Sequence, residues 1–161
     1  MRKIIVAVLF INVAFALWAL YLRAPLTSRG LNVFCEASLK LSNDRDGSVF
    51  DFDGTIVTRF KNDGTGYLDL LGVAGRQGKI YNVSREVNFS WVPKDEDGIY
   101  GITLHTATVT QGDNTPNELV ENNITGRMNV VNSYIVRHAN HNTWSIGNIY
   151  TPIVMCVDKK N

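Results

Sequence analysis

The chain has 161 residues, of which 45% are hydrophobic and 19% are charged, and its formal net charge is +1 at pH 7. Beyond Arg23 it holds thirteen basic and fifteen acidic residues, which form no basic stripe. Direct nucleic-acid binding by this part is therefore excluded, because such binding needs a clustered positive face. The length is typical of one domain with a sizeable core.

Residues 4–22 form an apolar segment, IIVAVLFINVAFALWALYL, which carries no charge and one amide side chain, Asn12. At about 1.5 Å rise per residue, a helix of this length spans close to the ~30 Å hydrocarbon core of a bilayer. Trp18 and Tyr21 near its end are typical of the membrane–water interface. The short basic start, residues 1–3, predicts a cytoplasmic N-terminus, so the rest of the chain lies outside.

A cleaved signal peptide is the alternative interpretation of this segment. An Ala-Phe-Ala sequence at residues 14–16 offers a cleavage site, but the apolar run continues to Leu22 without a polar region. The pattern favours a retained transmembrane anchor. Both interpretations export the remaining chain, which we expect in a bacterial periplasm, with residues 23–30 as a linker and 31–161 as the exported domain.

The two cysteines, Cys35 and Cys156, lie at opposite ends of the exported part. In an oxidising compartment this placement predicts one disulfide that joins the first strand to the last. In the loop-entropy model such a long closed loop contributes about 4–5 kcal/mol to stability. Two buried free thiols are the alternative, and they are less expected outside the cytoplasm.

From residue 31 onward, apolar and polar residues alternate with the period of β-structure. Short polar turns, several with Asp-Gly, separate the apolar runs, which is typical of antiparallel hairpins. The pattern predicts a mainly β fold, an antiparallel meander of seven or eight strands that can close into a small barrel. The expected strands cover 31–41, 48–61, 66–73, 79–91, 99–110, 126–138, 143–150 and 153–157, with a turn at 42–47.

One short helix is expected between the fifth and sixth of these strands. The sequence Thr115-Pro116-Asn117-Glu118 fits a capping box with proline at the first helical position, and the helix would end near residue 123. The chain leaves no room for helical crossovers between parallel strands.

Large apolar side chains from five expected strands fall on the faces that point to a common interior. A barrel of this size either fills with side chains or holds one small ligand, and composition alone favours a filled core. Aromatic residues also suit the lining of an apolar ligand pocket. The candidate ligand-contacting residues are Phe50, Phe52, Phe89, Trp91, Tyr134 and Trp144.

Residues 49–57, VFDFDGTIV, resemble the opening motif of haloacid-dehalogenase-type phosphatases. There the first Asp is the nucleophile and the second the acid/base, with magnesium between them, so Asp51 and Asp53 would take these roles. That motif ends a buried parallel strand, whereas a hairpin follows here and the later metal-binding carboxylates are missing from the sequence. His138 and His141 likewise lack the companions of a metal site. We therefore predict no catalytic residue, metal or cofactor, and interpret both aspartates as solvent-facing.

The pattern as a whole resembles the FidL-like family of bacterial membrane proteins, in which an N-terminal anchor precedes a periplasmic β-domain. The resemblance covers nearly the whole chain and depends most on the cysteine pair and on the anchor followed by a meander. The short motifs that carry it are Cys35, Phe52-Asp53-Gly54, Asp63-Gly64-Thr65-Gly66, Gly72, Asp113-Asn114-Thr115-Pro116, Pro152 and Cys156.

Such proteins are similar to ToxS-like and VtrC-like partners of membrane-bound ToxR-like transcription regulators. The resemblance implies a lipocalin-like barrel that is completed or stabilised by the regulator's periplasmic part, and a pair that binds bile salts. It carries over no ligand residues. The hypothesis is a non-enzymatic accessory subunit in the bacterial inner membrane, pairing with such a regulator to sense an amphipathic ligand such as a bile salt or an acyl chain. The alternative is a self-sufficient, membrane-anchored carrier of a hydrophobic ligand.

Overall fold

The computed structural model describes residues 11–18, 30–45 and 47–159. The chain divides into two units, Met1–Gly30 and Leu31–Asn161. In the first unit residues 11–18 are helical, and the other residues of the predicted anchor, 4–10 and 19–22, lie outside the described part. Among the described residues, no helix is long and apolar enough to cross a membrane.

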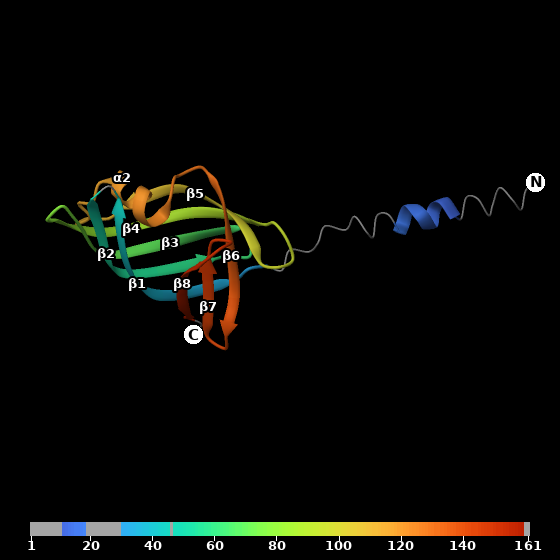
Figure 1. Ribbon diagram of the computed structural model, residues 1–161. Helices are drawn as coiled ribbons and strands as arrows, with labels where there is room; N and C mark the ends of the chain where they lie inside the picture. The colour runs from blue at the N-terminus through green and yellow to red at the C-terminus, as the bar shows by residue number, and fades with distance from the viewer. Residues whose placement is uncertain (1–10, 19–29, 46, 160–161) are drawn as a thin grey trace, which may run out of the picture. The chain divides into compact units, whose positions relative to one another are not determined.

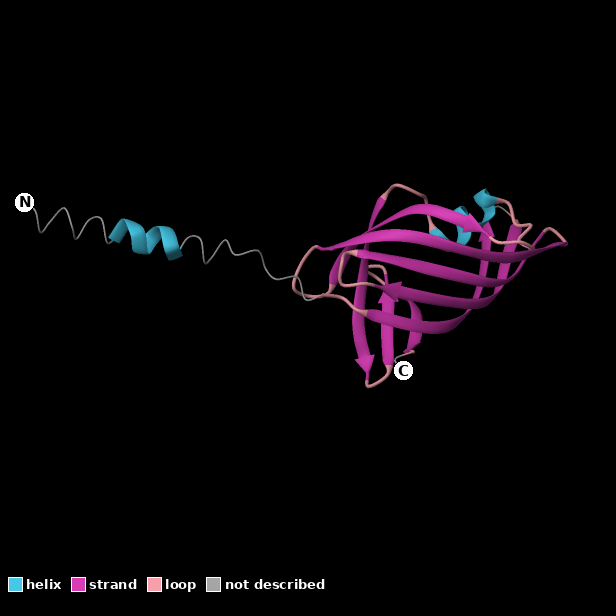
Figure 2. Ribbon diagram, turned by 180° about the vertical axis from the view of Figure 1, so that it is seen from behind, coloured by secondary structure: helices cyan, strands magenta, loops and turns pink. Residues whose placement is uncertain are grey.

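The second unit is a closed antiparallel barrel in which each strand pairs with the next and the last pairs with the first (Figures 1 and 2). This confirms the predicted β-barrel, with eight strands where seven or eight were expected. The strands are β1 (Val33–Arg45), β2 (Ser48–Phe60), β3 (Thr65–Arg76), β4 (Lys79–Pro93), β5 (Ile99–Val109), β6 (Val131–Asn140), β7 (Thr143–Gly147) and β8 (Pro152–Asp158). Between β5 and β6 lie the short helix α2 (Asn117–Val120) and the π-helix η1 (Glu121–Thr125).

Alternation along the strands decides which residues enter the core. In β2, Phe50, Phe52 and Phe60 are buried, whereas Asp51 and Asp53 between them are exposed. The same period of two holds along β4, whose inward positions are almost all buried. Burying one face of each strand in this way removes apolar side chains from water, which is the main favourable contribution to folding.

Three local predictions were wrong. The expected turn at 42–47 is mostly strand, because β1 stays in register with β2 as far as Arg45 opposite Ser48. The capping box does not form, because the Thr115 hydroxyl donates to the Asn82 carbonyl oxygen instead, at 2.8 Å. β6 begins five residues later than expected, after a turn in which Asn129 has a positive φ of 58°.

Three glycines of the family-like motifs permit close approach between strands and aromatic rings. Gly54 lies opposite Gly72 in the register of β2 and β3, and a Cβ on either would overlap the facing backbone and the Phe52 ring. A Cβ on Gly66 would overlap the Arg59 carbonyl oxygen and the ring of Phe89. These positions therefore take glycine because neighbouring atoms occupy the place of a side chain.

Replacing Gly66 by alanine should lower the free energy of unfolding by about 1–3 kcal/mol, because the new methyl group must displace Phe89 or the backbone of β2. Gly75→Ala on the same strand is the matched control, since its Cβ would have no neighbour closer than 3.9 Å. Urea denaturation of both variants measures the difference. Equal stabilities for the two variants would show that the barrel relaxes around residue 66 at no cost.

Cys35 and Cys156 form the predicted disulfide, which joins β1 to β8 with a Cα–Cα distance of 5.3 Å. Both residues are buried in the core. The bridge closes a sequence separation of 121 residues, so it links the two ends of the barrel sheet covalently.

Candidate functional site

One end of the barrel interior is filled by aromatic rings. The ring centroid of Phe60 lies 5.0 Å from that of Phe89 and 6.5 Å from that of Trp91, and Trp91 lies 5.4 Å from Tyr100. The Trp91 indole N–H donates to the carbonyl oxygens of Lys61 and Thr65, at 3.1 Å each. Because its polar group is satisfied, Trp91 acts here as a core residue.

Beside this cluster lies a mostly apolar cavity of about 110 Å³. Side chains of β2 to β8 and of η1 line it, and three hydroxyl-bearing residues contribute, Thr58, Thr125 and Tyr134. Burial raises the pKa of the Tyr134 phenol, so this hydroxyl is neutral at physiological pH. Pockets for drug-sized ligands are typically about 300–1,000 Å³. The cavity is therefore smaller than a steroid would need.

Two of the six candidate ligand-contacting residues, Phe89 and Tyr134, line this cavity. Phe50, Phe52 and Trp91 are buried in the core without lining it, and Trp144 is half-buried. The Trp144 ring stands edge-on to His138 with centroids 4.6 Å apart. Its indole nitrogen is the one buried side-chain N or O atom without a hydrogen-bond partner in the described part of the chain. Ligand contact by any of the six stays a prediction.

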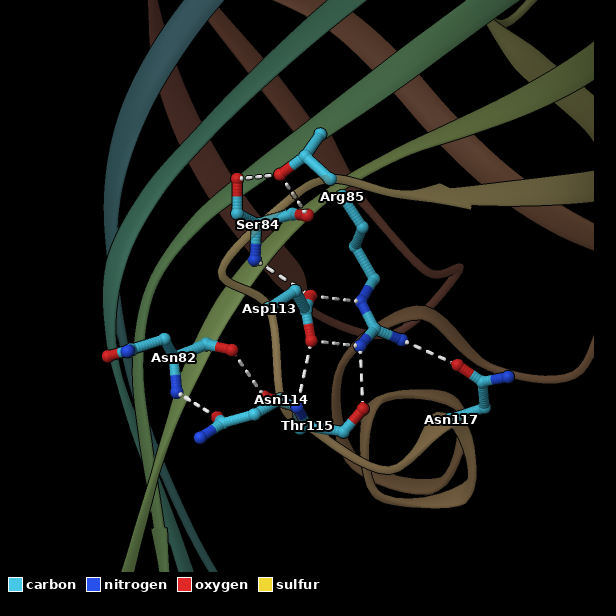
Figure 3. A network of polar contacts seen from close by, with 8 residues as sticks. Asn82, Ser84, Arg85, Asp113, Asn114, Thr115 and Asn117 are labelled. Atoms are coloured by element: carbon cyan, nitrogen blue, oxygen red, sulfur yellow. Dashed lines mark hydrogen bonds and ion pairs between the residues drawn. The ribbon is translucent and has the colours of Figure 1, made fainter.

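The segment between β5 and β6 crosses the other end of the barrel, and we call residues 110–126 the cap. Its first half is bonded to β4: the Ser84 N–H donates to Asp113, and the Asn82 N–H to the Asn114 side chain (Figure 3). Its second half reaches β1, where the Asn43 amide donates to Asn123 at 3.2 Å. A segment bonded to both β4 and β1, three strands apart, lies across the end of the barrel (Figures 1 and 2).

A buried ion pair holds the first half of the cap. Arg85 donates to both carboxylate oxygens of Asp113, at 2.9 and 2.7 Å, and also to the Thr115 carbonyl oxygen and the Asn117 side chain (Figure 3). The two paired side chains are 2% and 0% exposed. Burial would raise the pKa of Asp113, but hydrogen bonds from Arg85, Ser84 and Thr115 and the charge of Arg85 together lower it. The pair therefore stays ionised near neutral pH.

Sequence reasoning missed Arg85. It occupies an inward position of β4, between Val83 and Val87, where alternation calls for an apolar side chain. A charged residue in an otherwise apolar inward pattern was the signal that could have identified this site. Arg85 is tolerated there because it pairs with Asp113 of the Asp-Asn-Thr-Pro motif.

The seam between β1 and β8 is short. Two residue pairs form its ladder, Cys35 with Asp158 and Glu36 with Val157, although β1 pairs with β2 over its whole length. The Lys159 N–H donates to the Phe34 carbonyl oxygen, and Lys159 forms an ion pair with Glu36.

An open groove of about 520 Å³ lies at this seam. Its lining comes from Glu36, Ala37 and Ser38 on β1 and from residues 155 and 157–159 on and after β8. The disulfide and a few backbone hydrogen bonds therefore close the barrel between β1 and β8. Among the described residues, most of the β8-facing edge of β1 has no strand partner.

Asp51 and Asp53 lie on the outer face of an antiparallel strand. Asp51 accepts a hydrogen bond from Ser42 at 2.7 Å, and Asp53 pairs with Lys40 at 2.8 Å. The phosphatase motif lies at the end of a parallel strand, whereas β2, which carries Asp51 and Asp53, pairs antiparallel with both of its neighbours. Within the described ranges, no three His, Cys, Asp or Glu residues gather where they could hold a metal ion.

Comparison with known proteins identifies the family. The family model described as "FidL-like putative membrane protein" matches residues 72–156, which span β4 to β7 and reach the second cysteine of the bridge. No curated protein and no solved structure matches the chain. The matched part covers more than half of the chain, so the protein belongs to the FidL-like family of membrane proteins.

Proposed function

We propose that this protein is an accessory subunit of the bacterial inner membrane, with its N-terminus in the cytoplasm and its barrel in the periplasm. The family is one of membrane proteins. The buried disulfide fits an oxidising compartment. The apolar, uncharged run of residues 4–22 supplies the anchor in this proposal.

Its partner in this proposal is a membrane-anchored, ToxR-like transcription regulator, and the observation that carries the pairing is the open edge of β1. Because the Phe34 carbonyl oxygen faces β8, the even-numbered residues of β1 direct their backbone N–H and C=O groups to that side. Ser38 in the groove, and Lys40 and Ser42 further along β1, therefore present these groups on the edge that faces β8. Such an edge is a template for an added strand.

The surroundings of the groove also suit an added strand. Leu39 and Leu41 on the inner face of β1 are half-buried, so a further strand would cover them. On the outer face of β8, Ile153, Met155 and Val157 are 51%, 52% and 58% exposed. The partner would thus extend the sheet at the seam. The resemblance implied that the regulator completes or stabilises the barrel. In this proposal it does not need to complete it, because β1 and β8 already pair.

In the ligand part of the proposal, the pair senses an amphipathic molecule in the barrel interior. A cavity of about 110 Å³ does not accommodate a bile salt in this state. The small volume also favours the accessory role over that of a self-sufficient carrier, because a carrier must enclose its ligand without help.

The pairing is tested with Lys40→Pro and Lys40→Ala in the full-length protein. Proline removes the N–H on the β8-facing edge of β1 but none that β2 uses, so the barrel should fold, whereas strand addition should fail. Both variants lose the exposed ion pair with Asp53, which makes alanine the matched control. Affinity capture from membranes of the native host, quantified by mass spectrometry, gives the result.

We expect the wild type and Lys40→Ala to capture a single-span, DNA-binding membrane protein, and Lys40→Pro to capture at least tenfold less of it. Capture of no such protein by the wild type would overturn the proposed pairing. Equal capture by both variants would retain the pairing but place it away from the edge of β1.

A further inference from the structure

The two halves of the cap are attached to the barrel in different ways. Residues 110–117 are held by the Arg85–Asp113 ion pair and by backbone hydrogen bonds to β4. We call residues 118–126 the plug. In the described structure, one hydrogen bond joins the plug to a strand, and it runs from the Asn43 amide to Asn123. Burial of apolar side chains, chiefly Leu119 and Val120, supplies the rest.

The plug is built from short and irregular helix. It contains the last three of the four residues of α2 and all of η1, a five-residue π-helix, and neither helix has a side-chain hydrogen bond at its N-cap. π-Helices are rare and are frequently found at functional sites. The plug ends at Gly126, whose positive φ of 85° is a conformation that glycine adopts without strain. Little besides apolar contact therefore opposes its displacement.

The plug also forms part of the wall of the cavity. Ile124 and Thr125 line it, whereas the other lining residues belong to strands whose positions are fixed by the hydrogen-bonded barrel. An engineered cavity of about 150 Å³ binds benzene, so the space of about 110 Å³ admits no more than a molecule of that size. A larger ligand needs the volume that the plug side chains occupy.

We propose that the plug is a gate, and that the space it vacates binds the hydrocarbon chain of a single-chain amphiphile such as a fatty acid. This inference rests on the ligand-binding part of the proposed function. A flexible chain needs only the slender volume of Leu119, Val120 and Ile124. Ile124 lines the apolar cavity, and Leu119 and Val120 are buried in the same core. A rigid four-ring steroid needs a wider space than these side chains fill, and displacing the first half of the cap to widen it would break the buried Arg85–Asp113 pair.

The test fixes the plug to β1 and follows where a fatty acid binds. Asn43→Cys with Asn123→Cys places two thiols where the two side chains now meet, and a short bismaleimide joins them. The native cysteines are bridged and do not react. Full-length protein in lipid nanodiscs is irradiated with palmitic acid that carries a diazirine near its chain end, and the labelled residues are mapped by mass spectrometry.

We expect labelling of strand residues that line the cavity, such as Ile102 and Tyr134, in the protein without cross-linker, and at least tenfold less after cross-linking. Labelling of the apolar segment 4–22 by probe in the bilayer should not change, which controls for probe concentration. A diazirine-bearing bile acid should label the cavity in neither form. Asn43→Cys with Asn122→Cys is a second pair, used if the first variant loses its native thermal transition.

The outcomes separate this inference from the proposed function. Equal fatty-acid labelling of the cavity before and after cross-linking would overturn the gate, and cavity labelling by the bile acid would overturn the assigned ligand class. If neither probe labels the cavity, both the gate and the ligand part of the proposed function are wrong. The pairing with a regulator is judged independently, by capture with the Lys40 variants.

Discussion

Replacing Asp113 by asparagine should destabilise the barrel by about 3–5 kcal/mol, because it leaves the buried guanidinium of Arg85 without a counter-charge. The neighbouring groups do not compensate, since Arg85 already donates to the Thr115 carbonyl oxygen and to Asn117. Chemical denaturation at pH 7 measures the loss. An unfolding free energy within 1 kcal/mol of that of the wild type would mean that water or another acceptor satisfies Arg85.

The double variant Arg85→Met with Asp113→Asn is the control for this charge. It removes the buried cation and keeps one acceptor oxygen at residue 113 for one of the two N–H groups, of Ser84 and Thr115, that donate to separate oxygens of Asp113 in the wild type. It should therefore be more stable than the single Asp113→Asn variant, and this non-additivity is the signature of a coupled pair.

The same pair should make stability depend on pH in the acid range. The pKa of Asp113 is lowered in the folded protein, so its contribution is fully present above the unfolded-state pKa of about 3.9 and is lost as the pH falls through the folded-state pKa. The stability difference between the wild type and Asp113→Asn should accordingly shrink below about pH 4.

The strand order of the barrel could be predicted because alternation and turns are local signals. A period of two marks Phe50 and Phe52 as inward and the aspartates beside them as outward, whatever the strand pairs with. The end of β1 could not be predicted in this way. Its last residues, Ser42–Arg45, are typical of turns, and they form strand because the register with β2 continues to Ser48.

The candidate site was harder to predict, because its parts are distant in sequence. Nothing local to Arg85 shows that a carboxylate 28 residues later will neutralise it inside the barrel. The size of the cavity also could not be predicted from the amino-acid composition. Of the six aromatic candidates, Phe50, Phe52, Phe89 and Trp91 are buried and Tyr134 and Trp144 are half-buried, and the rings of Phe89 and Trp91 pack against Phe60 inside the barrel.

Removing the disulfide by Cys35→Ala with Cys156→Ala should lower the free energy of unfolding by about 2–5 kcal/mol. The bridge spans 121 residues of sequence, so its loss frees a large part of the unfolded chain from constraint. Its location adds a second effect. Because the ladder between β1 and β8 has two residue pairs, the seam should open before the rest of the barrel once the bridge is gone.

Urea denaturation gives the global loss, and hydrogen exchange gives its distribution along the chain. Amides of β8 should exchange faster in the double variant by a larger factor than those of β3 and β4, which are paired over their whole length. The wild type denatured and refolded under reducing conditions is the control, because it loses the bond and keeps both side chains. If exchange in β8 speeds up no more than in β3 when the disulfide is removed, backbone pairing and apolar packing hold the seam. The seam would then offer no weakly held edge to which a partner strand could bind.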